Sequence, residues 1–112
     1  MSKLETYLIK IDTNINDALI QMSKSDCRTL IVMDKKKVTG ILSEGDIIRG
    51  FINGFLPSNS INEIIQYDFK YVTKNNLEEA YDFIKNNLIL LLPVVSKNME
   101  LVDIITIKDF IK

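Results

Sequence analysis

Two segments of the chain combine residue types and a spacing that could bind a phosphorylated sugar. Ser43-Glu44-Gly45-Asp46 and Thr106-Ile107-Lys108-Asp109 each place a hydroxyl three residues before an aspartate, directly after an apolar run. If the hydroxyl residue caps a helix, free backbone amides and the positive end of the helix dipole point outward, which suits a phosphate. The aspartate one turn later can accept two hydrogen bonds from a cis-diol such as that of a ribose.

The same pattern also has a purely structural interpretation. A hydroxyl residue three positions before an acid is the capping box of a helix, and Ser60-Ile61-Asn62-Glu63 shows it where no site is expected. Capping alone explains a single occurrence. Two occurrences at the same point of a duplicated unit favour a pair of related ligand sites instead.

The duplication extends over most of the chain at an offset of 62 residues. Apolar stripes at helical spacing begin at Ile15 and Leu77, and apolar runs follow at 30–34 and 92–96. A second apolar run in each copy leads into one of the two hydroxyl-acid segments. Asp46 and Asp109 are 63 residues apart, so the second copy has one additional residue in its turn.

Each copy is expected to fold as β-α-β-β-α, which makes the fold class α+β. Neither half is large enough to bury much core alone, so the halves should pack with pseudo-two-fold symmetry into one module. We expect one repeat over 1–56, a connection with a short helix over 57–68, and the other repeat over 69–112. The predicted strands are 7–11, 30–33, 38–42, 70–73, 90–95 and 101–105, and the predicted helices are 15–23, 43 to Gly50 or Gly54, 77–86 and 106–112.

Composition restricts the function further. Fourteen basic and fifteen acidic residues leave a net charge of −1, which gives no overall attraction for nucleic acid. The longest apolar stretch, 88–95, is too short to span a membrane. The lone Cys27 excludes an internal disulfide and is typical of a reducing cytoplasm, where we expect the protein. With no histidine and no nucleophile paired with a base, we expect no enzyme activity.

The repeated segments resemble a tandem pair of cystathionine β-synthase (CBS) domains, often called a Bateman module. The resemblance rests on segments 16–19, 30–34 and 40–48 of the first copy, with weaker counterparts at 77–80, 92–95 and 103–109. It implies a regulatory module that binds an adenosine-containing ligand (AMP, ADP, ATP or S-adenosylmethionine) in clefts between the repeats. No catalytic cofactor is implied.

The resemblance also implies roles for individual residues. Asp46 and Asp109 would hold the ribose, and Ser43, Thr106 and Arg28 the phosphate. The first cleft would combine Ile104, Thr106 and Asp109 with Thr13, Ala18, Cys27 and Arg28. The second would combine Ile41, Ser43 and Asp46 with Asn75, Ala80, Ile89 and Leu90. Since Asp103 would repel a phosphate unless it faces solvent, we expect Ser43 and Asp46 to form the better site.

The resemblance leaves a second interpretation open, in which the module serves association and its clefts bind no ligand. Paired modules of this family associate through their helices, so a homodimer is expected, and Phe51, Phe55 and Phe83 could contribute to it. Such modules regulate an attached or partner protein. Some precede sugar-nucleotide transferases, and this chain could be the corresponding piece of a longer protein.

Overall fold

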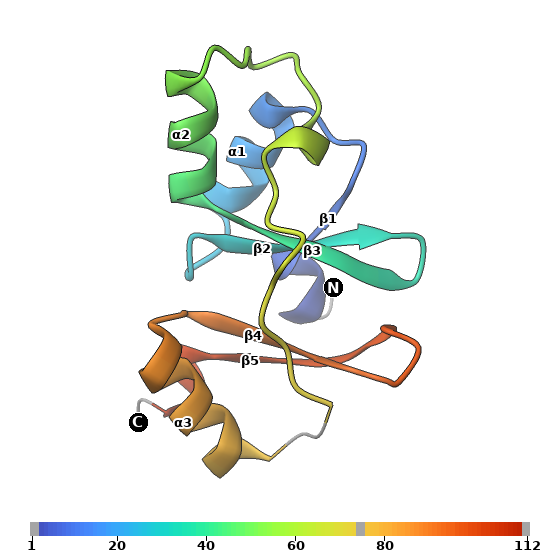
Figure 1. The fold of residues 1–112 in the computed structure, drawn as a ribbon, viewed down its shortest axis with the longest axis vertical. Helices are drawn as coiled ribbons and strands as arrows, with labels where there is room; N and C mark the ends of the chain where they lie inside the picture. Colours follow the sequence, from blue (N-terminus) through green and yellow to red (C-terminus); the bar gives the residue numbers. More distant parts are fainter. Residues whose placement is uncertain (1–2, 74–75, 111–112) are drawn as a thin grey trace.

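The computed structural model describes residues 3–73 and 76–110, which form four layers, helix–sheet–sheet–helix (Figure 1). Two small sheets face each other in the middle, and the helices of each half cover the outer face of that half's sheet. The arrangement agrees with the predicted α+β module of two packed repeats.

The first half contains a three-stranded sheet in the order β1-β2-β3, with β1 parallel to β2 and β2 antiparallel to β3. Its chain order is η1 (Lys3–Tyr7), β1 (Leu8–Lys10), α1 (Ile15–Ser23), β2 (Thr29–Asp34), β3 (Lys37–Ser43), α2 (Glu44–Ile52) and η2 (Ile61–Glu63). The predicted helix over 15–23 is therefore confirmed, and Asn14 caps it by accepting a hydrogen bond from the Asp17 amide. The predicted short helix after Ser60 is a single 3-10 turn.

The second half repeats this order with fewer regular residues. It contains α3 (Leu77–Asn87), β4 (Leu91–Val95), β5 (Leu101–Thr106) and the 3-10 turn η3 (Ile107–Phe110). β4 and β5 form an antiparallel pair, whose register shifts between Val94 and Val95. The β2–β3 pair shifts between Val32 and Met33, which are the counterparts of those residues 62 positions earlier. The two hairpins therefore share the same irregularity as well as the same sequence pattern.

Two predicted elements of the second half are wrong in detail. Residues 70–73 are not a strand and make only one parallel bridge, between Val72 and Val94. The Val72 amide donates to the Pro93 carbonyl, and the Val72 carbonyl accepts from the Val95 amide. To extend this parallel pairing toward residue 70, the backbone nitrogen of Pro93 would have to donate a hydrogen bond, and proline has no amide hydrogen. The predicted α-helix over 106–112 is a 3-10 turn over Ile107–Phe110, and residues 111–112 lie outside the described residues.

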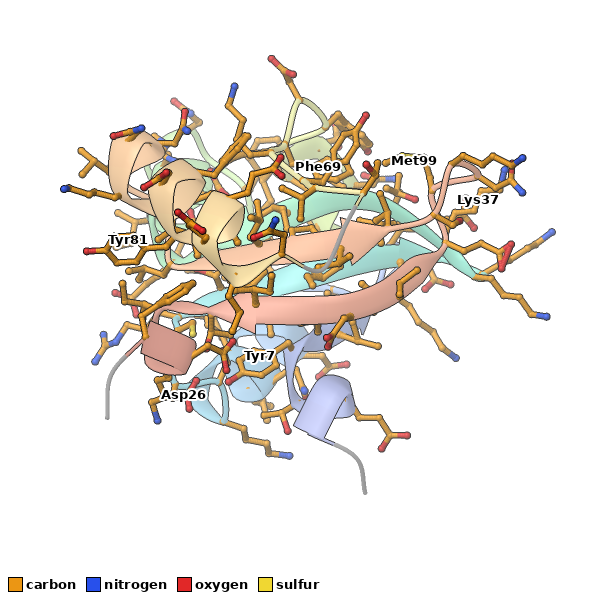
Figure 2. The ribbon with its side chains drawn as sticks, turned by 90° about the horizontal axis from the view of Figure 1, so that it is seen from below. Tyr7, Asp26, Lys37, Phe69, Tyr81 and Met99 are labelled. Atoms are coloured by element: carbon orange, nitrogen blue, oxygen red, sulfur yellow. The ribbon has the colours of Figure 1, made fainter. Side chains whose placement is uncertain are left out.

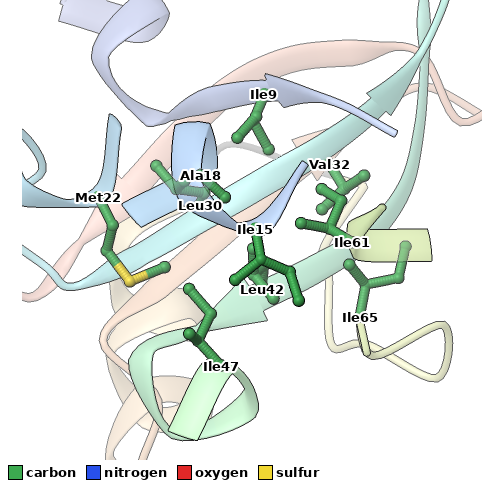
Figure 3. Close-up of a cluster of buried hydrophobic side chains, with 10 residues drawn as sticks. All are labelled: Ile9, Ile15, Ala18, Met22, Leu30, Val32, Leu42, Ile47, Ile61 and Ile65. Atoms are coloured by element: carbon green, nitrogen blue, oxygen red, sulfur yellow. The ribbon is translucent and has the colours of Figure 1, made fainter. Parts of the chain in front are cut away.

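Three hydrophobic clusters fill the spaces between the four layers. In β2, Leu30 and Val32 face α1 and α2, whereas Ile31 faces the other sheet (Figure 3 shows the cluster under the helices). In β4, Leu92 and Val94 lie in the cluster with α3, while Leu91 and Val95 lie between the sheets. Because the strands bury both faces, their sequences are continuously apolar rather than alternating.

Candidate functional site

A cavity of about 430 Å³ lies where the end of β3 meets the loop between α3 and β4. Its walls include four of the residues predicted for the second cleft: Ile41, Ser43, Ile89 and Leu90. Ile41 and Ser43 come from the first half and the other two from the second half. The structure thus brings these residues together across the two repeats, and the cavity falls in the usual size range of small-molecule sites.

Ser43 occupies the predicted N-cap of α2 and forms a complete capping box with Asp46. The Asp46 amide donates to Ser43 Oγ at 3.2 Å, and the Ser43 amide donates to Asp46 Oδ2 at 2.8 Å. Ser43 Oγ also donates to Asp46 Oδ2 at 2.9 Å. The capping interpretation of the motif is therefore correct for this segment.

The Asp46 carboxylate is only 6% exposed and receives two further donors. Arg49 Nη2 donates to Oδ1 at 2.7 Å, and Gln66 Nε2 lies 3.1 Å from Oδ1 and 2.9 Å from Oδ2. A carboxylate offers about four lone-pair positions. Both oxygens are thus occupied by protein donors in this structure.

Gln66 is a site residue that the sequence patterns did not indicate. Its backbone forms a reciprocal pair with Ile41, with the Ile41 amide donating to the Gln66 carbonyl at 3.0 Å and the reverse bond at 2.8 Å. A Cβ on Gly40 would approach the Gln66 carbonyl oxygen to 2.9 Å. A glycine inside a strand indicates that another backbone segment approaches closely. Gly40 was therefore the one feature of the sequence that could have indicated a segment packed against β3 at this point.

The second hydroxyl-acid segment has the same backbone geometry with different side-chain contacts. The Thr106 amide donates to Asp109 Oδ2 at 2.8 Å, as the Ser43 amide does to Asp46. The Thr106 side chain is buried, and its Oγ1 makes no hydrogen bond within the described residues, although the Cys27 thiol lies beside it. Asp109 is exposed, whereas Asp46 is buried.

Cys27 and Ile104 of the predicted first cleft share one apolar cluster between the sheets, together with Tyr7. The Tyr7 hydroxyl donates to Asp26 Oδ1 at 2.7 Å, and Lys108 Nζ lies 2.6 Å from Asp26 Oδ2 (Figure 2 shows Tyr7 and Asp26). The hydrogen bond from Lys108 lowers the pKa of Asp26 to about 2, and burial raises the pKa of the Cys27 thiol to about 11. These contacts join the 26–28 loop to η3.

The raised pKa of Cys27 predicts a loss of stability in alkali. Folding favours the thiol over the thiolate, so this contribution is complete below the ordinary pKa of 9.0 and disappears as the pH rises through about 11. We expect the free energy of unfolding to fall by about 2 kcal/mol across this range. Urea denaturation at pH 8, 9, 10 and 11 measures it.

Cys27→Ala is the control for that titration, because it removes the thiol and leaves Tyr7 in place. Burial also raises the pKa of Tyr7, whose contribution begins above its ordinary value of 10.0. The variant should therefore lose the decline between pH 9 and 10 and retain a decline above pH 10. An identical decline in both proteins would contradict the assignment to Cys27.

The remaining predicted residues that the structure describes do not line this cavity. The Arg28 side chain is 72% exposed, and its Nη1 lies 3.0 Å from Glu44 Oε2. Thr13 lies before α1, and its carbonyl accepts from the Ile61 amide. Ala18 and Ala80 are fully buried in the helix-facing clusters of their own halves. Asp103 Oδ1 accepts from the Ile104 amide, and Asn75 lies outside the described residues.

Each half also carries a surface groove between its first long helix and the start of the following helical turn. The two grooves use counterpart positions 62 or 63 residues apart and have opposite chemistry. Three of these positions carry charged side chains in the first groove and apolar side chains in the second. The charged residues are Asp26, Arg28 and Glu44, and their respective counterparts are Leu88, Leu90 and Ile107. Leu88 is 91% exposed and has a φ of 53° at the end of α3.

Among residues 3–73 and 76–110, no group of three or more His, Cys, Asp or Glu side chains could hold a metal ion. The described helices are all too short to cross a bilayer as an apolar span.

Comparison with solved structures gives close matches to the fold. A protein assigned to acetoin utilization, AcuB from Vibrio cholerae, superposes with a TM-score of 0.84 at 30% identity, over 94% of this chain and 79% of that one. The cytosolic domain of the Mg²⁺ channel MgtE in complex with ATP superposes with a TM-score of 0.75 at 24% identity, over 96% of this chain and 44% of that one.

Sequence comparison gives a curated relative and a family. An uncharacterized 17.7 kDa protein from Acidianus ambivalens is 29% identical over 107 residues, and this chain spans 65% of its length. The sequence profile of the CBS domain matches residues 2–53 and again residues 61–112. The duplicated pattern, the two packed half-modules and these two matches place the chain in the CBS domain family as a tandem CBS pair.

Proposed function

We propose that this CBS pair is a regulatory module that binds an adenine nucleotide in the cavity beside Ser43. The observation that carries the proposal is the joint wall of Ile41, Ser43, Ile89 and Leu90, contributed by both repeats. The MgtE domain, which shares the fold, is in complex with ATP. A ligand held by both halves would stabilise their arrangement, which is how binding could reach an attached or partner protein.

The proposed roles follow from side-chain chemistry. Ile41, Ile89 and Leu90 offer aliphatic surface for a purine ring. Asp46 can accept from the ribose hydroxyls once its present donors are exchanged, and Ser43 lies where a phosphate oxygen would approach the N-terminus of α2. Lys70 also lines the cavity, and it is the cation on the wall that the sequence patterns missed. The predicted phosphate cation Arg28 is instead paired with Glu44, and Arg49 is paired with Asp46.

We propose a second, unequal site at Thr106 and Asp109. The buried Thr106 hydroxyl without a hydrogen bond is a group that a ligand could satisfy. The predicted phosphate cation of that cleft, Arg28, instead pairs with Glu44 of its own half. We therefore assign the primary site to Ser43 and Asp46.

Titration with ligands tests the proposal directly. Thermal unfolding should be followed with AMP, ADP, ATP and S-adenosylmethionine, with GMP as the control for base specificity. A ligand present at a hundred times its Kd should stabilise the protein by about 2.7 kcal/mol, which raises the Tm by several degrees. No shift with any adenosine ligand at millimolar concentration would refute nucleotide binding.

The second candidate function is association with another copy of the chain. α2 exposes Ile48, Phe51 and Ile52, and the groove of the second half is apolar. Because the counterpart groove of the first half is charged, an apolar helix face would pack more favourably against the second half of a partner copy. A dimeric mass by light scattering, together with an unchanged Tm in every ligand, would favour this function over nucleotide binding.

The protein that the module regulates is proposed on the resemblance alone. An attached or partner enzyme, such as a sugar-nucleotide transferase, would be the receiver of the binding signal.

A further inference from the structure

We propose that the Gln66 side chain is a latch that competes with the ribose for Asp46. The latch rests on the nucleotide site proposed above and adds a residue that sets its affinity and its preference for ribose over deoxyribose. Gln66 lies in the segment between the repeats and lines the same cavity as Ser43. Its Nε2 reaches both Asp46 oxygens, at 2.9 and 3.1 Å.

The donors around Asp46 show why a latch is needed. The Ser43 amide, the Ser43 hydroxyl, Arg49 and Gln66 together direct donors at both carboxylate oxygens. A ribose diol brings two more donors to the same group, whose capacity is about four. Existing contacts must therefore be given up before the diol can be held, and Gln66 makes two of them, the same number that the diol would make.

Gln66 is the donor that can leave at the lowest cost. The Ser43 bonds belong to the N-cap of α2, and Arg49 carries the charge that balances Asp46. Gln66 is a neutral, exposed side chain. Its backbone is held by two hydrogen bonds to Ile41, so opening requires only side-chain rotation.

The counterpart position in the other repeat carries a different type of side chain. The residue 62 positions before Gln66 is Leu4, whose side chain has no hydrogen-bonding group. Asp109, the counterpart of Asp46, is exposed to solvent. The Gln66 amide is therefore a difference in sequence between two otherwise duplicated segments, and the proposed latch concerns the Asp46 site.

A closed latch reduces apparent affinity by the fraction of time for which it is open. If it is closed nine-tenths of the time, a ligand that needs Asp46 binds about tenfold more weakly than it would to an open site. A ligand without the 2′-hydroxyl gains less from displacing Gln66. The latch therefore narrows the difference in affinity between ribose and deoxyribose ligands.

Gln66→Met tests the latch, because methionine keeps the length and most of the volume and removes the amide. Calorimetric titration with ATP and 2′-deoxy-ATP, on the wild type and the variant, should show ATP binding about three- to tenfold tighter in the variant. The affinity for 2′-deoxy-ATP should change by less than about twofold. Gln21→Met removes the other glutamine, which bonds the Thr6 carbonyl outside the cavity, and should change neither affinity.

The outcomes separate the latch from the nucleotide site. If the wild type binds ATP, and Gln66→Met binds each nucleotide no more tightly than the wild type does, the latch is wrong and the nucleotide site stands. If both nucleotides tighten together, Gln66 acts through the shape of the cavity and the latch is also wrong. If neither protein binds either nucleotide, both proposals fall. Binding of ATP by the variant alone would support the latch.

Discussion

Asp46→Ala is expected to lower the free energy of unfolding by about 2 to 4 kcal/mol and to weaken nucleotide binding at least tenfold. The carboxylate is nearly buried and holds the Ser43 cap, Arg49 and Gln66 together. Hydrogen bonds to a charged group contribute about 1.5–3 kcal/mol each, and a lost cap costs about 1 kcal/mol. Urea denaturation followed by circular dichroism measures the first effect, and calorimetric titration with ATP measures the second.

Asp109→Ala is the matched control for this substitution. Asp109 makes the same bond to the amide of its cap residue, Thr106, but is exposed, so its loss should cost less than about 1.5 kcal/mol. Binding at the primary site should be unchanged. Equal destabilisation by the two substitutions would contradict the unequal burial of the two aspartates. Full ATP affinity in Asp46→Ala would contradict the assignment of the ribose to Asp46.

Ile31→Ala is expected to destabilise the whole module by about 3 kcal/mol, without separating the unfolding of its two halves. Ile31 is fully buried in the cluster between the sheets, which contains residues from both repeats. Large-to-small substitutions of this kind cost about 2–5 kcal/mol because they leave a cavity. Since the halves share this cluster, the denaturation should remain a single transition. Circular dichroism and tyrosine fluorescence should report the same midpoint.

Val102→Ala is the control for the core substitution. Val102 lies on β5 and is 59% exposed, so its truncation should change stability by about 0.5 kcal/mol or less. Two separate transitions in Ile31→Ala would contradict the shared core, since one half would then be stable alone.

The cap geometry was predictable because it is local. Three residues separate Ser43 from Asp46, and Thr106 from Asp109, so the sequence alone places each carboxylate near its cap amide. The loop partners Ile89 and Leu90 followed from the resemblance, which carries spatial information that spacing does not. Gln66 did not follow from either, because its bond to Asp46 joins positions 20 residues apart.

The strand predicted over residues 70–73 shows the opposite failure, because the tertiary contacts of this segment do not follow its local sequence pattern. Residues 70–73 have strand-like composition, yet the neighbouring strand presents Pro93 where the next amide donor is required. Similarly, the predicted phosphate cation Arg28 is paired with Glu44, and Lys108 is paired with Asp26. Charge pairing across the fold depends on distances that no sequence spacing gives.

The sequence by itself determined the duplicated unit, the helix α1, the two hairpins and both capping segments, because each depends on periodicity or on contacts within a few residues. The sequence also led us to expect two unequal segments, but only the tertiary structure shows how the burial and the contacts of the two segments differ. Asp46 is buried and accepts hydrogen bonds from Arg49 and Gln66, whereas Asp109 is exposed. The Thr106 hydroxyl is buried and makes no hydrogen bond within the described residues. The physical reason is that the burial of a side chain, and donors such as Gln66, depend on segments that are distant in the chain, whereas the capping pattern depends only on residues three positions apart.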